Sequence, residues 1–318
     1  EMFAAMDAVT RVPAPINEPV LDYAPGSPER AQLEVALAEL GSTCMELPHT
    51  IGGKRVTGTG KKIDVRQPHA HKLVLGTMHE ATTAEAEAAV TAATAAAPAW
   101  RALSFDARAA ILLKAADLLA GPWRARIVAA TMLGQSKTCY QAEIDAACEL
   151  IDFWRFNVHF ASEILAEQPP ANSKGIWNRI DYRPLEGFVY AITPFNFTAI
   201  AGNLPTAPAL MGNTVVWKPS SSQQLAAQLT MELLEEAGMP PGVINMVTGH
   251  GVNVSPVVLS SPDLAGIHFT GSTPLFQSLW QQVGANLKMY KTYPRLVGET
   301  GGKDFILAHP SADPDVLR

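Results

Sequence analysis

The sequence predicts an α/β protein with a parallel, Rossmann-type sheet that is covered by helices on both faces. From residue 187 onward, short apolar runs alternate with helical segments, and small or polar turns follow the apolar runs. Strands of a parallel sheet are buried on both faces and so read as apolar runs, and right-handed helical crossovers connect them. A further observation adds a helical part ahead of the sheet, because residues 82–166 have helical periodicity almost throughout.

The composition predicts a large folded chain without a nucleic-acid partner or a membrane span. The 318 residues are 47% hydrophobic and 17% charged, which suffices for one large or two ordinary domains. The net charge is −6 and no basic block occurs, so we expect no contacts to a phosphate backbone. The longest apolar runs are well short of the length that crosses a bilayer.

The cysteines and the first residue give information about the cellular compartment of the protein. Cys44, Cys139 and Cys148 lack C-x-x-C spacing, and their odd number favours a reducing compartment over a disulfide framework. The chain begins at Glu1 without an initiator methionine or a visible signal. This start is consistent with a removed targeting segment or with omission of the first residues.

The elements before the sheet are predicted in chain order. A proline-rich start leads to a helix over 29–40 with Ser27 near its beginning. "HTIGGKRV" and "KKIDVRQP" are predicted as two short strands joined by a glycine-rich turn, and "GTMHEAT" ends a third. The helical part follows, with Thr83 and Ser104 as predicted N-caps. "SKGIWNRIDYRPLEG" alternates large residues and predicts an extended strand or a protruding β-hairpin at about 174–186.

The elements of the sheet itself alternate regularly. Helices are predicted over 223–236, 252–260 and 274–289. We find no internal repeat. The predicted strands are "GFVYAIT", "NTVVWKPS", "GVINMVTG", "GIHFTGS", "RLVGE" and "DFILAH".

Five successive strands of this region end in turns suited to ligand binding: "TPFNF", "KPSSS", "GHG", "TGST" and "ETGGK". Ligands of parallel α/β sheets bind beyond the carboxyl ends of the strands. The series therefore predicts a cofactor crevice. The candidate cofactor-binding residues in and beside these turns are Ile192, Thr193, Pro194, Phe195, Lys218, Pro219, Ser220, Ser221, Gly249, Gly251, Phe269, Thr270, Gly271, Ser272 and Thr273.

Taken singly, each of these turns has two interpretations. Gly249 and Gly251 suggest an incomplete dinucleotide fingerprint or a plain turn. Residues 271–273 start a helix, where backbone N–H groups could hold a pyrophosphate, although Ser272 could serve only as an N-cap. Lys218 is either a solvated lysine or a hydrogen-bond donor to ribose hydroxyls.

Two polar residues point to chemistry. Asn196 lies between two phenylalanines, where a fixed carboxamide could stabilise an oxyanion or could simply form a turn. Glu299, in "GETGGK", is expected to have apolar surroundings that raise its pKa and suit it to act as a general base for water. The alternative for Glu299 is a carboxylate at a helix N-terminus or on the surface.

An oxyanion donor, a general base for water and a cofactor crevice would also need a nucleophile to hold an acyl group while hydride leaves. Cys148 is predicted to pack inside a helix that Cys139 begins, and Cys44 lies in a linker, so none of the three is well placed. His69 and His71 could suggest a metal pair, but without further ligands nearby they are interpreted as loop residues.

The segments "TPFNF", "WKPS", "FTGST" and "ETGGK", in this order, resemble the signature segments of the aldehyde dehydrogenase superfamily. "QAEIDAACELIDFWRFN", "LEGFVYAITPFNFTAIAGNLPTAPALMGN" and "YPRLVGETGGK" resemble most closely its glutamate-semialdehyde branch, the Δ1-pyrroline-5-carboxylate dehydrogenases. The resemblance runs from about residue 17 to the end. It implies an aldehyde dehydrogenase-like fold and NAD-dependent oxidation of L-glutamate γ-semialdehyde to L-glutamate, in proline catabolism.

The resemblance also implies roles for single residues. Asn196 would be the oxyanion-stabilising amide, and Glu299 the base that activates water. Glu149 would be a substrate-side carboxylate, and Phe197 an aromatic wall of the aldehyde pocket. Lys218 and the turn 193–195 would contact the adenosine and nicotinamide parts of NAD. Residues 271–273 would form the pyrophosphate turn.

The resemblance further implies a mitochondrial matrix location and a small-molecule aldehyde substrate. It also implies a homodimer, a higher homo-oligomer or a larger mitochondrial assembly, with the hairpin as oligomerisation arm.

The sequence departs from the family in two places. Many relatives carry an acidic residue three positions after the lysine, where this chain has Ser221, so we expect some NADP tolerance. The family's nucleophilic cysteine lies on a loop beyond the glutamate, past Arg318, and we expect the catalytic domain to be truncated. Residues 1–297 are then the cofactor-binding domain and 298–318 the start of the catalytic domain. The alternatives are a non-catalytic nucleotide-binding or structural subunit, and an aldehyde dehydrogenase for another substrate.

Overall fold

The computed structural model describes residues 11–318 and is built on a seven-stranded sheet of order β10-β9-β6-β7-β8-β2-β3. Neighbours from β10 to β8 run parallel, which confirms the predicted sheet, whereas β2 and β3 are antiparallel additions at one edge. The strands are β2 (His49–Ile51), β3 (Lys54–Val56), β6 (Phe188–Ile192), β7 (Thr214–Lys218), β8 (Ile244–Met246), β9 (Leu264–Gly271) and β10 (Arg295–Thr300).

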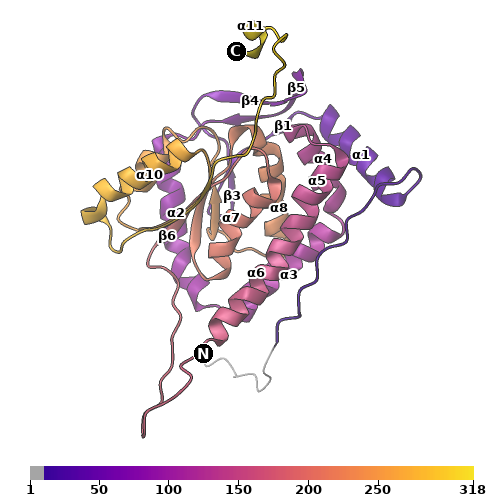
Figure 1. Cartoon of the computed structure of the whole chain (residues 1–318). Coiled ribbons are helices and arrows are strands. Elements are labelled where there is room, and N and C mark those ends of the chain that lie inside the picture. Colours follow the sequence, from indigo (N-terminus) through magenta and orange to yellow (C-terminus); the bar gives the residue numbers. More distant parts are fainter. Residues whose placement is uncertain (1–10) are drawn as a thin grey trace.

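Helices cover both faces of this sheet (Figure 1). On one face, α7 and the helices behind it (α1, α3, α4, α6 and α8) share an apolar cluster with Val189 and Trp217. On the other face, α2, α9 and α10 share a second cluster with Phe188 and Tyr190. Successive residues of a strand point to opposite faces, so β6 contributes to both clusters.

The helices have the following bounds: α1 (Pro28–Ser42), α2 (Thr83–Ala102), α3 (Phe105–Ala120), α4 (Arg124–Gln135), α5 (Cys139–Ala142), α6 (Glu149–Ala166), α7 (Thr198–Leu210), α8 (Gln224–Ala237), α9 (Val254–Ser260), α10 (Thr273–Ala285) and α11 (Pro314–Leu317). A π-helical turn η1 (Glu143–Cys148) joins α5 to α6. Two 3₁₀ turns are η2 (Ser221–Gln223) and η3 (Leu287–Met289). Within residues 11–318, none of these helices combines the length and apolar character needed to cross a bilayer.

The helix starts follow the predicted capping closely. Ser27 and Ser104 are N-caps whose side chains accept from the backbone N–H three residues on. The cap of α2 is Thr82 rather than the predicted Thr83. Glu85 explains this one-residue shift, because its carboxylate accepts from the backbone N–H of Thr82 at 2.6 Å and so completes a capping box.

The strands before α2 form two structures rather than one. "HTIGGKRV" is itself a hairpin, β2 and β3, because Gly52 and Gly53 adopt positive φ angles of 58° and 75°. "KKIDVRQP" contributes β4 (Lys62–Gln67), which pairs with β5 (Ala70–His79) in a separate sheet of order β1-β5-β4, where β1 is Met45–Glu46. The prediction of a single strand at "HTIGGKRV" was therefore wrong.

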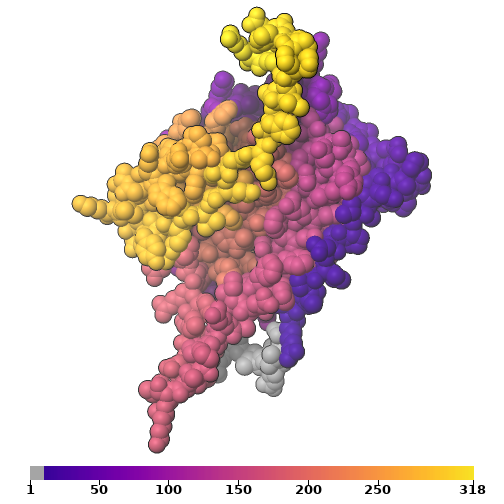
Figure 2. Space-filling view, viewed as in Figure 1, coloured from indigo at the N-terminus to yellow at the C-terminus, as the bar shows by residue number. Residues whose placement is uncertain are grey.

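Residues 167–187 project from the body as an arm, at the opposite end from residues 301–318 (Figures 1 and 2). The arm protrudes as predicted, but its two legs form no strands. The Gln168 side chain donates to the carbonyl of Ile180 at 3.3 Å and accepts from its N–H at 3.0 Å. A side-chain amide thus takes the backbone groups that a β-ladder would use, and the predicted β-hairpin is corrected to an extended arm.

Two further elements differ from prediction. "DFILAH" lies within an irregular segment in which Phe305, Ile306 and Leu307 are exposed, because this part of the chain has no strand beside it. The helix α7 was not predicted, since Pro205 and Pro208 interrupt its pattern. Burial against the sheet offsets the backbone hydrogen bonds that the two prolines remove.

A buried ionic network ties the segment before α1 to the helical layer. Glu143, which is fully buried, pairs with Arg124 and accepts hydrogen bonds from Leu21 N at 2.9 Å and the Tyr23 hydroxyl at 2.7 Å. Arg124 Nη1 also contacts a Glu18 carboxylate oxygen at 2.6 Å. Burial alone would raise the pKa of Glu143, but these donors lower it overall, so the carboxylate stays ionised.

Candidate functional site

A cavity of about 1300 Å³ opens at the carboxyl ends of the parallel strands. It lies where the sequence predicts the cofactor crevice. Among the predicted site residues, only Pro219, Gly249 and Glu149 are not in its wall. Those that line it are Ile192, Thr193, Pro194, Phe195, Asn196, Phe197, Lys218, Ser220, Ser221, Gly251, Phe269, Thr270, Gly271, Ser272, Thr273 and Glu299.

The loop that carries Asn196 is fixed at both of its ends. At one end, the Thr193 hydroxyl accepts a hydrogen bond from the buried indole of Trp217 at 3.0 Å. At the other end, the Thr198 hydroxyl bonds to Thr131 at 2.8 Å and accepts from the Gln135 amide at 2.7 Å. Asn196 itself is half-buried in the cavity wall between these fixed points. The backbone on both sides of Asn196 is thus anchored, and its carboxamide remains a candidate donor to an oxyanion.

Lys218 ends β7 with its ammonium folded back over the neighbouring turn. Its Nζ donates to the carbonyls of Pro219 at 3.0 Å and Gly249 at 3.3 Å. Burial lowers the pKa of Lys218 to about 8. Gly249 has φ +94°, and a Cβ there would lie 2.7 Å from Glu80 Cα, so the turn can pack this closely only with glycine. The ammonium of Lys218 is thus held by two carbonyls, and its role toward ribose hydroxyls stays a prediction.

The start of α10 presents a free helix N-terminus to the cavity. Ser272 occupies the N-cap position, but its side chain makes no capping hydrogen bond. Gly271 lies against the Phe269 ring, where a Cβ would approach to 2.7 Å. The first-turn N–H groups and the helix dipole together favour an anion such as a phosphate.

Glu299 lies on β10, the edge strand of the sheet, beside Thr270 of β9. The Thr270 hydroxyl donates to its carboxylate at 3.4 Å. Glu299 lines the same cavity as Asn196, but it is exposed, which corrects the expectation of apolar surroundings. The physical reason is its position, because an edge strand has a neighbour on one side only.

Glu149, the first residue of α6, lies behind the cavity wall. It is half-buried, and its backbone N–H bonds to the carbonyl of Ile144, five residues back, in the π-helical pattern. Burial raises the pKa of Glu149, as does the carboxylate of Asp145, whereas Lys137 lowers it. Glu299 also raises it, which places both carboxylates within electrostatic reach of each other.

The sequence analysis missed two further groups in or beside the cavity wall. The Lys137 ammonium lies 2.6 Å from an Asp145 carboxylate oxygen and 3.8 Å from the centroid of the Phe197 ring. No sequence signal could have identified Lys137, because a lysine between two helices is normally solvated. The second group is His250, which lines the cavity next to Gly251 and has its Nδ1 2.6 Å from a Glu80 carboxylate oxygen. It is the middle residue of "GHG", so that motif contained the signal.

The cysteines of the described part of the chain do not line this cavity. Cys148 is buried, and burial and the Glu143 carboxylate raise its pKa to about 12, so it is a neutral thiol. Cys139 is half-buried with a raised pKa, and Cys44 is exposed between α1 and β1. Within residues 11–318, His, Cys, Asp and Glu form no group of three that could hold a metal ion.

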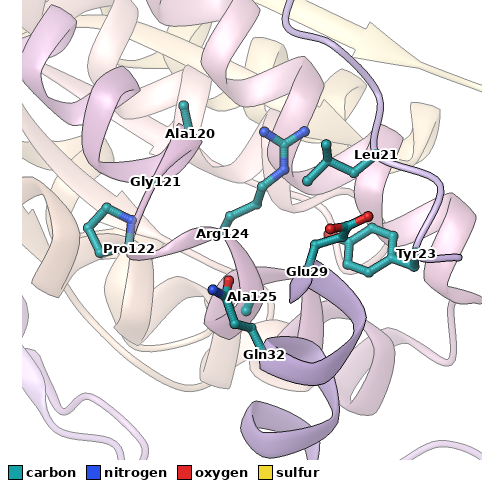
Figure 3. A pocket seen from close by; sticks show the side chains of 9 residues that line it. All are labelled: Leu21, Tyr23, Glu29, Gln32, Ala120, Gly121, Pro122, Arg124 and Ala125. Carbon is teal, nitrogen blue, oxygen red and sulfur yellow. The ribbon is translucent and has the colours of Figure 1, made fainter. Parts of the chain in front are cut away.

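A second, smaller cavity of about 340 Å³ lies beside the buried ionic network (Figure 3). Its wall includes Tyr23, Glu29 of α1, Pro122 of the turn before α4, and Arg124, the first residue of α4. The guanidinium of Arg124 is already occupied by carboxylates and by the carbonyl of Pro19. This cavity lies away from the strand ends and carries no catalytic set.

The chain resembles known proteins along nearly its whole length. The model of the aldehyde dehydrogenase family matches residues 56–317. The Δ1-pyrroline-5-carboxylate dehydrogenase of Agaricus bisporus is 50% identical over 313 residues, which are 98% of this chain and 57% of that protein. The mitochondrial enzyme of Dictyostelium discoideum is 47% identical over 309 residues, 96% of this chain and 55% of that protein.

Solved structures agree with the sequence relatives. The Δ1-pyrroline-5-carboxylate dehydrogenase of Mycobacterium tuberculosis bound with NAD is 68% identical, with a TM-score of 0.93 over 98% of this chain and 58% of that one. The Thermus enzyme with bound NAD is 28% identical, with a TM-score of 0.81 over 92% of this chain and 57% of that one. The chain thus spans little more than half the length of the relatives it matches. It belongs to the aldehyde dehydrogenase family.

Proposed function

We propose that this chain is the cofactor-binding part of an NAD-dependent dehydrogenase that oxidises L-glutamate γ-semialdehyde to L-glutamate. The observation that carries the proposal is the single cavity that unites Asn196 and Glu299 with Lys218 and the N-terminus of α10. A scaffold would need none of these groups at strand ends. We assign residues 1–297 to the cofactor-binding domain and 298–318 to the start of a catalytic domain.

The residues present suit NAD. A cavity of about 1300 Å³ is large enough for a dinucleotide. Lys218 would donate to ribose hydroxyls, the N-terminus of α10 would hold the pyrophosphate, and residues 193–195 would contact the nicotinamide. Ser221 offers no carboxylate to repel a 2′-phosphate, so NADP should be tolerated as well. When bound, the cofactor supplies the acceptor for the hydride that leaves the aldehyde carbon.

The chain's own residues would serve both stages of the oxidation. We place the nucleophilic cysteine after Arg318. Its thiolate adds to the aldehyde carbonyl, and Asn196 donates to the resulting oxyanion. Loss of hydride leaves a thioester. Glu299 then takes a proton from water, which attacks the thioester and releases the acid and the thiol. A further segment packed beside β10 would give Glu299 the apolar surroundings that it lacks in the described residues.

The substrate and setting come from the relatives. Those named above are Δ1-pyrroline-5-carboxylate dehydrogenases by name, and the enzyme of Dictyostelium discoideum is mitochondrial, as is that of Emericella nidulans. We propose the same substrate for this protein, with Glu149 and Phe197 on the aldehyde side, a role in proline catabolism and a location in the mitochondrial matrix. The arm of residues 167–187 would contact a second copy of the chain in a homo-oligomer, or a partner in a larger mitochondrial assembly.

The test is a substrate comparison with NAD. The full-length protein should oxidise glutamate semialdehyde with a kcat/KM well above those for propanal and succinic semialdehyde. Equal or higher values for either competitor would overturn the proposed substrate and leave a dehydrogenase for another aldehyde. Absence of turnover with all three would overturn the proposed activity.

A second candidate is a non-catalytic nucleotide-binding or structural subunit. It is favoured by the observation that none of the described cysteines lines the cavity. The intact mass of the denatured polypeptide separates the two. A mass well above 34.0 kDa means that the chain continues past Arg318 and supports the enzyme. A mass near that value, with no companion polypeptide, supports the subunit.

A further inference from the structure

Lys137 lies in a turn whose geometry is unusual for its residue types. The connection between α4 and α5 contains Ser136, which adopts φ +56°, in the left-handed region. Residues other than glycine rarely adopt this conformation, and it clusters at functional sites. The Ser136 hydroxyl bonds to His69 of the β4–β5 turn at 2.8 Å, which helps to hold the strained residue. Lys137 follows directly.

The side chain of Lys137 is buried against the aldehyde end of the cavity. It is only 11% exposed, although lysine is among the residues least often buried. Its ammonium is held by Asp145 at 2.6 Å and lies over the Phe197 ring at 3.8 Å. Phe197 lines the cavity and directly follows Asn196 in the chain. A cation over an aromatic face is attractive, so Lys137 restrains the orientation of that ring.

Lys137 also acts on Glu149, which has several carboxylates around it. The carboxylates of Asp145 in η1, Asp152 in α6 and Glu299 in β10 all disfavour a negative charge on Glu149. Burial of Glu149 acts in the same direction and is the largest effect. Lys137 opposes them. The π-helical turn thus carries Asp145 close to this lysine, behind the part of the cavity wall that Phe197 forms.

Resting on the proposed function, we propose that Lys137 is a positioning residue for the aldehyde: held by Asp145, it clamps the Phe197 ring beside Asn196. Lys137 also favours the carboxylate form of Glu149, against burial and the neighbouring carboxylates, which raise the pKa of Glu149. The ion pair is local, since it joins Asp145 of η1 to Lys137 of the turn before α5.

The test compares Lys137→Met with Asp145→Asn in the full-length protein. Lys137→Met should raise KM for glutamate semialdehyde about tenfold, with a smaller change in kcat, because one cation–π contact and one favourable charge are lost. It should also move the acid limb of the kcat/KM profile to higher pH, since Glu149 becomes harder to ionise. Asp145→Asn removes a carboxylate and should move the limb to lower pH. Lys137→Arg should restore both values.

These opposite shifts distinguish positioning from mere structure. If the ion pair only stabilised the fold, both variants would break it and would change activity in the same direction. That result would overturn the proposal, as would a Lys137→Met variant with wild-type KM and acid limb. In a Glu149→Gln background both shifts should disappear. If Lys137→Met fails to fold, the acid limbs of Lys137→Arg and Asp145→Asn still show whether the limb moves in the expected direction.

Two controls keep the proposal separate from the proposed function. Affinity for NAD, measured by fluorescence titration, should be unchanged in every variant. Lys291→Met removes another lysine–carboxylate pair, with Asp263 at 2.5 Å, at the opposite ends of the strands, and should match wild type. An enzyme that prefers another aldehyde overturns the proposed substrate. In that case, KM of the same Lys137 and Asp145 variants for that other aldehyde still decides whether Lys137 positions Phe197.

Discussion

The two ends of the cavity are built in different ways. At the cofactor end, Lys218, Gly249 and Gly271 come from successive strand ends. Lys218 bonds to the Gly249 turn, and that turn packs against Glu80 in the segment before α2. At the aldehyde end, the loop of Asn196 and Phe197 is held by Thr131, Gln135 and Lys137, which come from α4 and the turn after it, some sixty residues earlier in the chain.

The two ends also differ in how completely the described residues enclose them. Lys218 is buried enough for its pKa to fall to about 8, whereas Glu299 stands exposed on an edge strand. A parallel sheet supplies a cofactor site almost unaided, because its strand ends meet at one edge. The reacting groups require support from other layers. The following predictions test this contrast, from the largest expected effect to the smallest.

Arg124→Met should destabilise the fold by about 3–5 kcal/mol, because it leaves the buried Glu143 carboxylate without its partner. Glu143 begins the π-helical turn that supports the aldehyde end, so activity should fall before NAD affinity does. Denaturant unfolding of the purified protein measures the change. Arg55→Met, which breaks the half-exposed pair with Glu235, is the matched control and should cost at most about 1 kcal/mol. Equal losses in both variants would contradict the assigned role of the network.

Asn196→Ala should lower kcat for glutamate semialdehyde by about a hundred- to a thousand-fold, as expected for loss of one oxyanion donor. Affinity for NAD should stay within about twofold, because the cofactor end does not depend on this side chain. Steady-state kinetics and fluorescence titration give the two values. A variant that loses NAD affinity as much as kcat would show that the two ends are not separate.

Lys218→Met should weaken NAD binding about ten- to a hundred-fold, since it removes a charged hydrogen-bond donor. In the wild type, the pKa of about 8 gives the sign of the pH dependence. Lys218 is protonated below pH 8, so affinity should be flat near pH 7 and should decline as pH rises through 8. Titration of NAD between pH 6.5 and 9.5 checks this, and the variant should show a flat curve. A wild-type affinity that rises with pH would refute the assignment.

The smallest effect concerns the adenosine ribose. Ser221 lies in the cavity wall, where an acidic side chain would repel a 2′-phosphate. The wild type should turn over NADP, and Ser221→Glu should lower kcat/KM for NADP about tenfold while leaving that for NAD within a few-fold. Parallel kinetics with both cofactors decide the matter, and a wild type inactive with NADP would contradict it. Ser222→Glu, one residue along the same 3₁₀ turn, is the positional control.

Much of the sheet and its strand ends could be predicted from the sequence. Apolar runs such as "GFVYAIT" and "NTVVWKPS" are buried strands, and the turns after them line one cavity. The errors occur where the deciding contact is distant. Gln168 replaces a β-ladder in the arm, burial sustains α7 despite Pro205 and Pro208, and an edge position exposes Glu299.

By itself, the sequence determined the parallel sheet, the order of its strand-end turns and most of the residue types that line the cavity. These features depend on local periodicity and on turn residues, which neighbours in the chain decide. Only the tertiary structure decided that Lys137 is buried over Phe197 and paired with Asp145, and that Cys148 lies inside an ionic network. The reason is physical, because burial and pKa depend on groups that the fold brings together from more than a hundred residues apart, such as Pro19 and Cys148.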